Sequence, residues 1–158
     1  MKTRVTIDTN TLLLLQRNAA FVRYMHHNYP IDTHRFVLPF ATEGEGFSFV
    51  IRGSWGTRRR EYFKAFLDDL RRVREVSDEM IQAYAEIDAY TLCQHPTLKK
   101  PQGETAHRMG KNDLWIAATT YVHADRIVTT DQDFIQLDGV FFPVDYIDIS
   151  EFTGRVSG

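Results

Sequence analysis

Carboxylates are the groups in this chain best suited to chemistry. Five of them lie at or near the ends of predicted strands and helices: Asp8, Glu45, Asp113, Asp131 and Asp133. Carboxylates that fold together repel one another and hold their protons tightly, unless cations lie between them. Such oxygen ligands suit Mg²⁺ or Mn²⁺, and no Cys and His spacing indicates zinc. A carboxylate-bound pair of these ions can hydrolyse phosphodiesters, because one activates water and the other stabilises the leaving oxygen.

Asp113 also has a simpler interpretation. Acids favour the first turn of a helix, where the helix dipole stabilises negative charge, and Asn112 can cap that turn. The apolar run from Leu114 to Val122 then predicts a buried helix that ends near His123. The other acids favour a shared site. Asp8 and Asp131 follow predicted strands, and ligand sites of parallel sheets form beyond the carboxyl ends of strands.

The hydrophobic pattern predicts strands alternating with helices. Strands are expected at residues 4–8, 36–40, 126–130 and 141–149, with a short extended piece at 73–76. Helices are expected from Asn10 or Thr11 to about Tyr24, and then at 41–51, 57–73, 78–90 and 112–123, with a short one near 134–137. This alternation indicates an α/β fold with a mainly parallel central sheet flanked by helices.

The composition limits the size and the location of the protein. The 158 residues suffice for one domain, 1–158, and are short for two. A net charge of −2 implies no global attraction to nucleic acid or membrane. The single cysteine fits a reducing compartment, and the aliphatic run from Leu12 to Leu15 is far too short to span a bilayer. With no signal peptide evident, we expect a cytoplasmic protein without a membrane partner.

Basic and polar residues surround the predicted site. The loop from Pro96 to Gly110 is long for a compact domain, and such loops are often functional. The end of this loop and the residue after it provide candidates for phosphate contacts: His107, Arg108 and Lys111. The alternative is that these side chains are only solvated. A second run of basic residues, at 58–74, could either contact nucleic acid or form a solvent-exposed helix face. Trp55, flanked by glycines, is the better candidate for base stacking or for an interface, whereas Trp115 is predicted to lie in the core.

Polar neighbours of the acids are predicted to orient the ligands or a bound water from the second layer of the site. These residues are Asn10, Asn112, Thr129 and Thr130.

Four segments in this order resemble the signatures of PIN-domain nucleases, most closely the VapC-type toxins of toxin–antitoxin modules. They are Ile7–Asn10, Thr42 with Glu45, Asn112–Ala118 and Val128–Phe134. Toxins of this kind usually have leucine after the glutamate and glycine four positions beyond it. Here Gly46 and Phe49 occupy those positions, so Glu43 is a rival for the role of Glu45.

The resemblance implies a PIN-like domain and an Mg²⁺- or Mn²⁺-dependent endoribonuclease. Asp8, Glu45, Asp113 and Asp131 would form its acidic site, with Asp133 as an additional member. It also implies a homodimer and a cognate antitoxin, which wraps the toxin and can present a basic side chain to the acids.

Other functions remain open. An RNA-processing nuclease would use the same chemistry, and the glycines around Glu45 also suit a PIN-fold binding module with a weakened site. A phospho-accepting receiver domain ranks below these, because Asp8 has no acidic neighbour.

Overall fold

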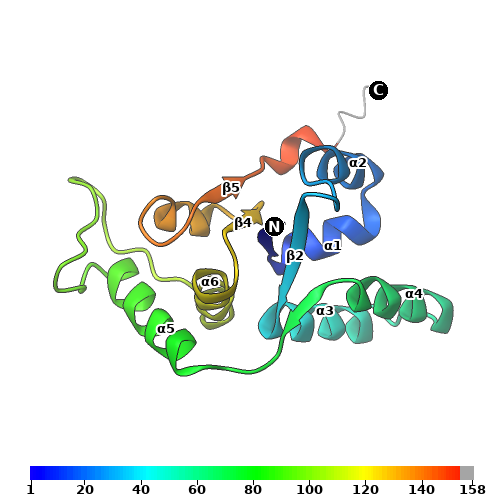
Figure 1. Ribbon diagram of the computed structural model, residues 1–158, viewed down its shortest axis with the longest axis horizontal. Coiled ribbons are helices and arrows are strands. Elements are labelled where there is room, and N and C mark those ends of the chain that lie inside the picture. Colours follow the sequence, from blue (N-terminus) through cyan, green and yellow to red (C-terminus); the bar gives the residue numbers. More distant parts are fainter. Residues whose placement is uncertain (154–158) are drawn as a thin grey trace.

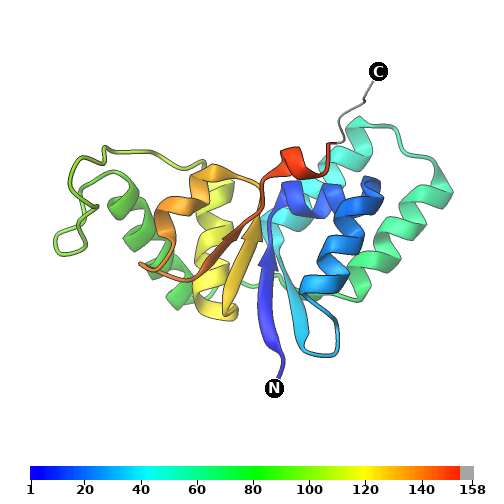
Figure 2. The same ribbon diagram turned by 90° about the horizontal axis from the view of Figure 1, so that it is seen from above.

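A five-stranded parallel sheet forms the centre of the computed structural model, which describes residues 1–153 (Figures 1 and 2). The strand order is β3-β2-β1-β4-β5, and every neighbouring pair is parallel. The strands are β1 (Thr3–Ile7), β2 (His34–Pro39), β3 (Arg71–Val73), β4 (Arg126–Thr129) and β5 (Val144–Tyr146). The predicted α/β class with a parallel sheet is therefore confirmed.

Strand β1 lies in the middle of the sheet and is buried on both sides. Its residues Val5, Thr6 and Ile7 are all fully buried, as parallel strands covered by helices on both faces generally are. The register aligns Ile7 with Val128 of β4. The residues that follow β1 and β4 therefore emerge at the same edge of the sheet.

Helices cover both faces of the sheet. They are α1 (Thr9–Arg17), α2 (Ala19–Asn28), α3 (Phe40–Arg52), α4 (Thr57–Asp68), α5 (Asp78–Thr91) and α6 (Lys111–His123), with short 3₁₀ helices η1 (Gln132–Leu137) and η2 (Ile149–Glu151). Helices α5 and α6 pack side by side on one face, and α1 and α2 pack on the other (Figures 1 and 2). Helix α3 follows β2 directly and contacts both α1 and α6. It thus brings its first turns to the carboxyl edge of the sheet.

The predicted continuous helix to Tyr24 is wrong, because the chain breaks at Asn18. Its backbone is extended, and its side chain accepts a hydrogen bond from the Phe21 N–H and so caps α2. The cap of α1 is Asp8, rather than Asn10 or Thr11. Helix α6 begins one residue earlier than predicted, after Gly110, so Asn112 lies inside the first turn and is not its cap.

Two predicted boundaries at the sheet edges are also wrong. Helix α4 ends at Asp68 instead of continuing to Val73, because residues 71–73 pair with β2 as strand β3. The last strand covers Val144–Tyr146 alone, since the preceding residues belong to the turn that follows η1. Strand pairing, which is a tertiary contact, here prevails over a local helical pattern.

The two tryptophans differ in their surroundings. Trp55 is buried, and the Arg59 guanidinium lies 3.5 Å from the centre of its ring, so its prediction as an exposed stacking platform is wrong. Trp115 is half-buried and packs against Phe40 and Tyr84, as predicted for a core residue. Between residues 1 and 153, none of the helices combines the length and apolarity that crossing a bilayer requires.

Candidate active site

Asp8 is the most deeply buried acid at the carboxyl edge of the sheet, with 3% of its surface exposed. It follows β1 and caps α1, since its Oδ1 accepts from the Thr11 N–H at 2.9 Å. Its Oδ2 accepts from the Thr129 hydroxyl at 2.5 Å. Burial raises the pKa of Asp8, although these hydrogen bonds favour its charged form. The carboxylate is thus held in one orientation.

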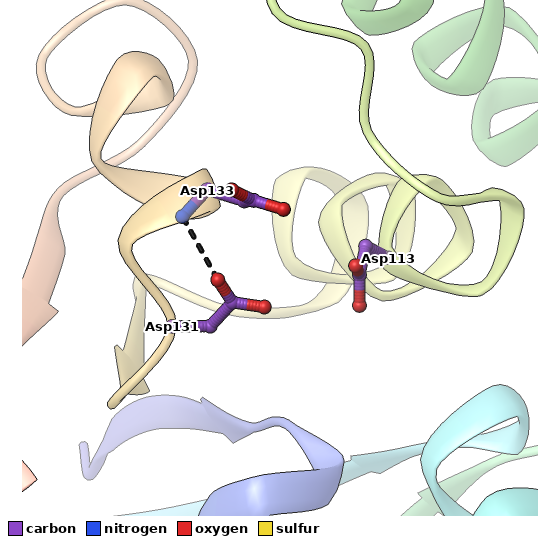
Figure 3. Close-up of side chains that lie close together, drawn as sticks. All are labelled: Asp113, Asp131 and Asp133. Atoms are coloured by element: carbon purple, nitrogen blue, oxygen red, sulfur yellow. Dashed lines mark hydrogen bonds between the residues drawn. The ribbon is translucent and has the colours of Figure 1, made fainter.

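Thr129 connects Asp8 to the acids that follow β4. Its hydroxyl oxygen accepts from the Asp131 N–H at 2.9 Å while it donates to Asp8. The Asp131 Oδ1 in turn accepts from the Asp133 N–H at 2.9 Å (Figure 3). Asp131 thereby caps η1. This chain of hydrogen bonds links Asp8, Asp131 and Asp133 through the turn that follows β4.

Asp113 faces these acids from the first turn of α6. The side chains of Asp131 and Asp133 point toward it across the space between η1 and α6 (Figure 3). One carboxylate oxygen from each of the three lies within 4.8 Å of the others. Burial raises the pKa of Asp113 to about 7, and the charges of Asp131, Glu45, Asp8 and Asp133 add to this effect. The five predicted acids, hereafter the acid cluster, therefore act on one another electrostatically.

The rival glutamates of α3 have separate places. The Glu45 Oε1 accepts from the Thr9 hydroxyl at 2.9 Å, beside Asp8. Glu43 is buried and receives two hydrogen bonds from Arg74, at 2.5 and 3.1 Å. The structure therefore brings Glu45, and not Glu43, into the acid cluster.

Of the predicted polar neighbours, Thr129 is the one that bonds directly to the cluster. Asn10, Thr130 and Asn112 donate no side-chain hydrogen bond to these acids among residues 1–153, and both asparagines are exposed. Asp8 accepts instead from the Thr11 N–H and the Thr129 hydroxyl. Arg108 and Lys111 are exposed just before Asp113, and neither forms an ion pair within the described part of the chain.

Two contacts of the cluster were not predicted from the sequence. Thr9 bonds to Glu45, a pairing of residues 36 positions apart that no local pattern signals. The His107 Nε2 lies 2.7 Å from the Asp133 Oδ1. The sequence predicted that His107 could contact phosphate, but in the structure its partner is the Asp133 carboxylate.

The acid cluster fits a hard divalent cation. Its donors are carboxylate oxygens, which Mg²⁺ and Mn²⁺ prefer. Adjacent ligands of an octahedral Mg²⁺ are about 3 Å apart and opposite ones about 4.2 Å apart, so three oxygens within 4.8 Å of one another would have to move closer together to share an ion. Burial and, after it, the like charges of the neighbouring acids oppose the ionisation of Asp113, and a cation would offset both effects.

Comparisons with known proteins bear on the fold. No protein-family model and no curated protein matches the sequence. Among solved structures, the fold is similar to a chain of VapBC2 from Rickettsia felis bound to a DNA fragment from its promoter, with a TM-score of 0.70 and 15% identity. It is also similar to a chain of VapBC-1 from nontypeable Haemophilus influenzae, with a TM-score of 0.64 and 19% identity. Each match covers 91% of this chain and 98% of the other.

These two likenesses extend over nearly the whole chain, and they agree with the parallel five-stranded sheet. The fold is therefore PIN-like. The acid cluster lies at the carboxyl edge of its sheet, where ligand sites of parallel α/β folds form.

Proposed function

We propose that this protein is an Mg²⁺- or Mn²⁺-dependent endoribonuclease that hydrolyses RNA phosphodiester bonds as the toxin of a toxin–antitoxin pair. The observation that carries the proposal is the convergence of five carboxylates, from four separate parts of the chain, at one edge of a PIN-like fold. An RNA-processing nuclease would use the same residues.

Asp113, Asp131 and Asp133 are the proposed ion ligands, with Asp8 beside them. Ions bound there supply a water of lowered pKa and stabilise the leaving oxygen. Asp8 lies beside these ligands, and the hydrogen bonds that its two oxygens accept from Thr11 and Thr129 hold its carboxyl group in place. Glu45 is anchored through Oε1 by Thr9, so its Oε2 is the atom that we propose accepts a proton from the attacking water.

The acid cluster repels RNA phosphates, so cations must offset its field. Arg108 and Lys111 are exposed on the chain immediately before Asp113 and can attract the phosphates on either side of the scissile one. Raising the salt concentration should therefore weaken RNA binding more than it weakens the binding of ions by the half-buried carboxylates.

The direct test is cleavage of labelled single-stranded RNA by the purified protein, with DNA of the same sequence as the control. We expect cleavage with Mn²⁺ or Mg²⁺, none in excess EDTA, and cleavage reduced by about 1,000-fold in Asp113→Asn. Cleavage that persisted in EDTA, or in the variant to the same extent, would contradict the proposal. Activity in the wild type alone also rules out a contaminating nuclease.

A cognate antitoxin is the proposed partner, because the two similar structures are VapBC complexes. A groove of about 770 Å³ lies between α1, α2 and α4. Its walls combine apolar side chains such as Leu15, Val22 and Phe66 with the basic Arg58 and Arg59. We propose that it receives an amphipathic segment of the antitoxin that carries acidic residues at its edges.

The partner proposal has its own test. A small reading frame upstream that encodes a DNA-binding N-terminus would supply the candidate antitoxin. Tyr62→Asp, in the groove, should prevent copurification of that protein, whereas Tyr121→Asp, exposed on α6 outside the groove, should not. Equal copurification by both variants would contradict the groove assignment. Sedimentation equilibrium of the free protein tests the homodimer that we also propose.

A further inference from the structure

A cavity of about 630 Å³ lies beside the acid cluster, between the loop of residues 96–110 and η1. This loop projects beyond α5 and α6 at one end of the molecule (Figures 1 and 2). Asp133 belongs both to the acid cluster and to the wall of the cavity, and its partner His107 lines the cavity as well. A molecule held at the cluster by a phosphate would therefore extend directly into this space.

Side-chain hydrogen bonds hold the loop in its place over η1. The Lys100 ammonium donates to the Thr105 carbonyl at 3.0 Å and to the Gln136 Oε1 at 2.9 Å. The Gln136 amide donates to the carbonyls of His107 and Asp133, at 3.2 and 2.9 Å. The wall of the cavity is thus joined by its own contacts to the turn that positions Asp131 and Asp133.

The size and the lining of the cavity suit a nucleoside. Small-molecule sites generally measure about 300 to 1,000 Å³. The residues that line the cavity include both donors and acceptors, among them Thr105, Gln132 and Glu104, and the Lys100 ammonium keeps one N–H beyond the two that it donates within the protein. The edges of RNA bases carry both kinds of group, and proteins read single-stranded RNA by hydrogen bonds to those edges. Tyr90 lines the cavity but is only 2% exposed, so its ring offers no open face on which a base could stack.

We propose that this cavity binds the base and ribose of the nucleotide adjacent to the scissile phosphate, so that the loop side chains that line it, Thr105 and Glu104 among them, select the sequence at which RNA is cut. This inference rests on the proposed nuclease function. It assigns base selection to the loop and leaves hydrolysis to the acid cluster.

The test compares kcat/KM for short RNAs that differ only in the base on either side of the cut. We expect a preference of about tenfold or more in the wild type, since a site that hydrogen-bonds its ligand discriminates strongly. Thr105→Trp should fill the cavity and reduce this preference to less than about twofold. Gln102→Trp, exposed on the same loop but outside the cavity lining, should leave the preference unchanged. Thermal melting and Mn²⁺ binding verify that both variants are folded.

A second measurement does not depend on the cavity-filling variant. RNA that carries 4-thiouridine next to the cut should crosslink, in Asp113→Asn protein, to residues 100–107 or 132–136. An active wild type with no base preference, an unaltered preference in folded Thr105→Trp, or crosslinks confined to other elements would overturn the inference alone. A wild type that cleaves no RNA would overturn the proposed function, and the inference with it.

Discussion

Glu43 and Glu45 lie two residues apart on α3 and have opposite surroundings. Glu43 is 8% exposed and is neutralised by the protein itself, with Arg74 at 2.5 Å and Arg72 at 3.8 Å. Glu45 joins four aspartates, and among residues 1–153 His107 is the basic side chain within ion-pair distance of this group. Two residues turn a helix by about 200°, so the two carboxylates point to different sides of α3.

This difference distinguishes a charge that stabilises the fold from charges that remain available to bind a ligand. At Glu43 the chain supplies both signs, and the pair holds α3 against the segment that follows β3. At the acid cluster the chain supplies one sign. Burial, and then the charges of the neighbouring acids, raise the pKa of Asp113, and the balancing charge is left to come from outside. The experiments below test this contrast, from the largest expected effect to the smallest.

Asp113→Asn should have the largest effect. The amide keeps the shape of the side chain but removes the charge that we propose holds an ion, so RNA cleavage should fall by about 1,000-fold, equivalent to roughly 4 kcal/mol. Single-turnover cleavage assays measure the loss. Asp125→Asn, at the opposite edge of the sheet where Asp125 pairs with Arg4, is the matched control and should cleave at the wild-type rate. Equal losses in both variants would indicate a general effect of removing acids.

The two glutamates should respond in opposite ways to the same substitution. Glu45→Gln should lower cleavage by about 10- to 100-fold, as expected for a proton acceptor, with little change in stability. Glu43→Gln should keep cleavage but lower the free energy of unfolding, because Arg74 and the half-buried Arg72 lose their charged partner. Urea unfolding and cleavage assays on both variants test the contrast. Cleavage lost with Glu43→Gln and kept with Glu45→Gln would reverse our assignment.

Thr129→Val tests the link between Asp8 and Asp131. The variant keeps the shape of the side chain but removes the hydroxyl that donates to Asp8 and accepts from Asp131. We expect a loss of about 1 to 3 kcal/mol in unfolding free energy, because a buried carboxylate loses a donor, together with weaker cleavage. Thr120→Val is the control, since the Thr120 hydroxyl donates to the Ile116 carbonyl of its own helix. Similar losses in the two variants would assign Thr129 a packing role.

The pH dependence of stability should be the smallest effect. The pKa of Asp113 is raised from 3.8 to about 7 in the folded state, so folding favours its protonated form. Its stabilising contribution is therefore present below pH 3.8 and is lost as pH rises toward 7. Without divalent ions, Asp113→Asn should be more stable than the wild type at pH 8 by about 1 to 2 kcal/mol after solvent screening.

The control for this prediction is the same comparison at pH 4, where the difference between Asp113→Asn and the wild type should nearly vanish. Addition of Mg²⁺ at pH 8 should raise the melting temperature of the wild type more than that of the variant, because ligands stabilise the state that binds them. A difference that did not depend on pH would contradict the raised pKa.

The sequence by itself determined the elements whose signals are local. The β-branched runs near Ile7 and Val128, the cap at Ser77 and the apolar stretch after Asp113 predicted their strands and helices, because burial and capping depend on neighbouring residues. Because the carboxyl ends of parallel strands meet at one edge, the meeting of Asp8 with Asp131 followed from the predicted fold class.

Only the tertiary structure decided contacts between distant segments. The choice of Glu45 over Glu43 depends on the rotation of α3, which Arg74 and Thr9 set from other parts of the chain. Likewise, the contact of His107 with Asp133, and the cavity between the loop and η1, exist because the chain returns to the same place after many residues. The pairing of β3 with β2 ended a helix that local spacing alone would have continued, since a sheet neighbour offers hydrogen bonds that no local pattern encodes.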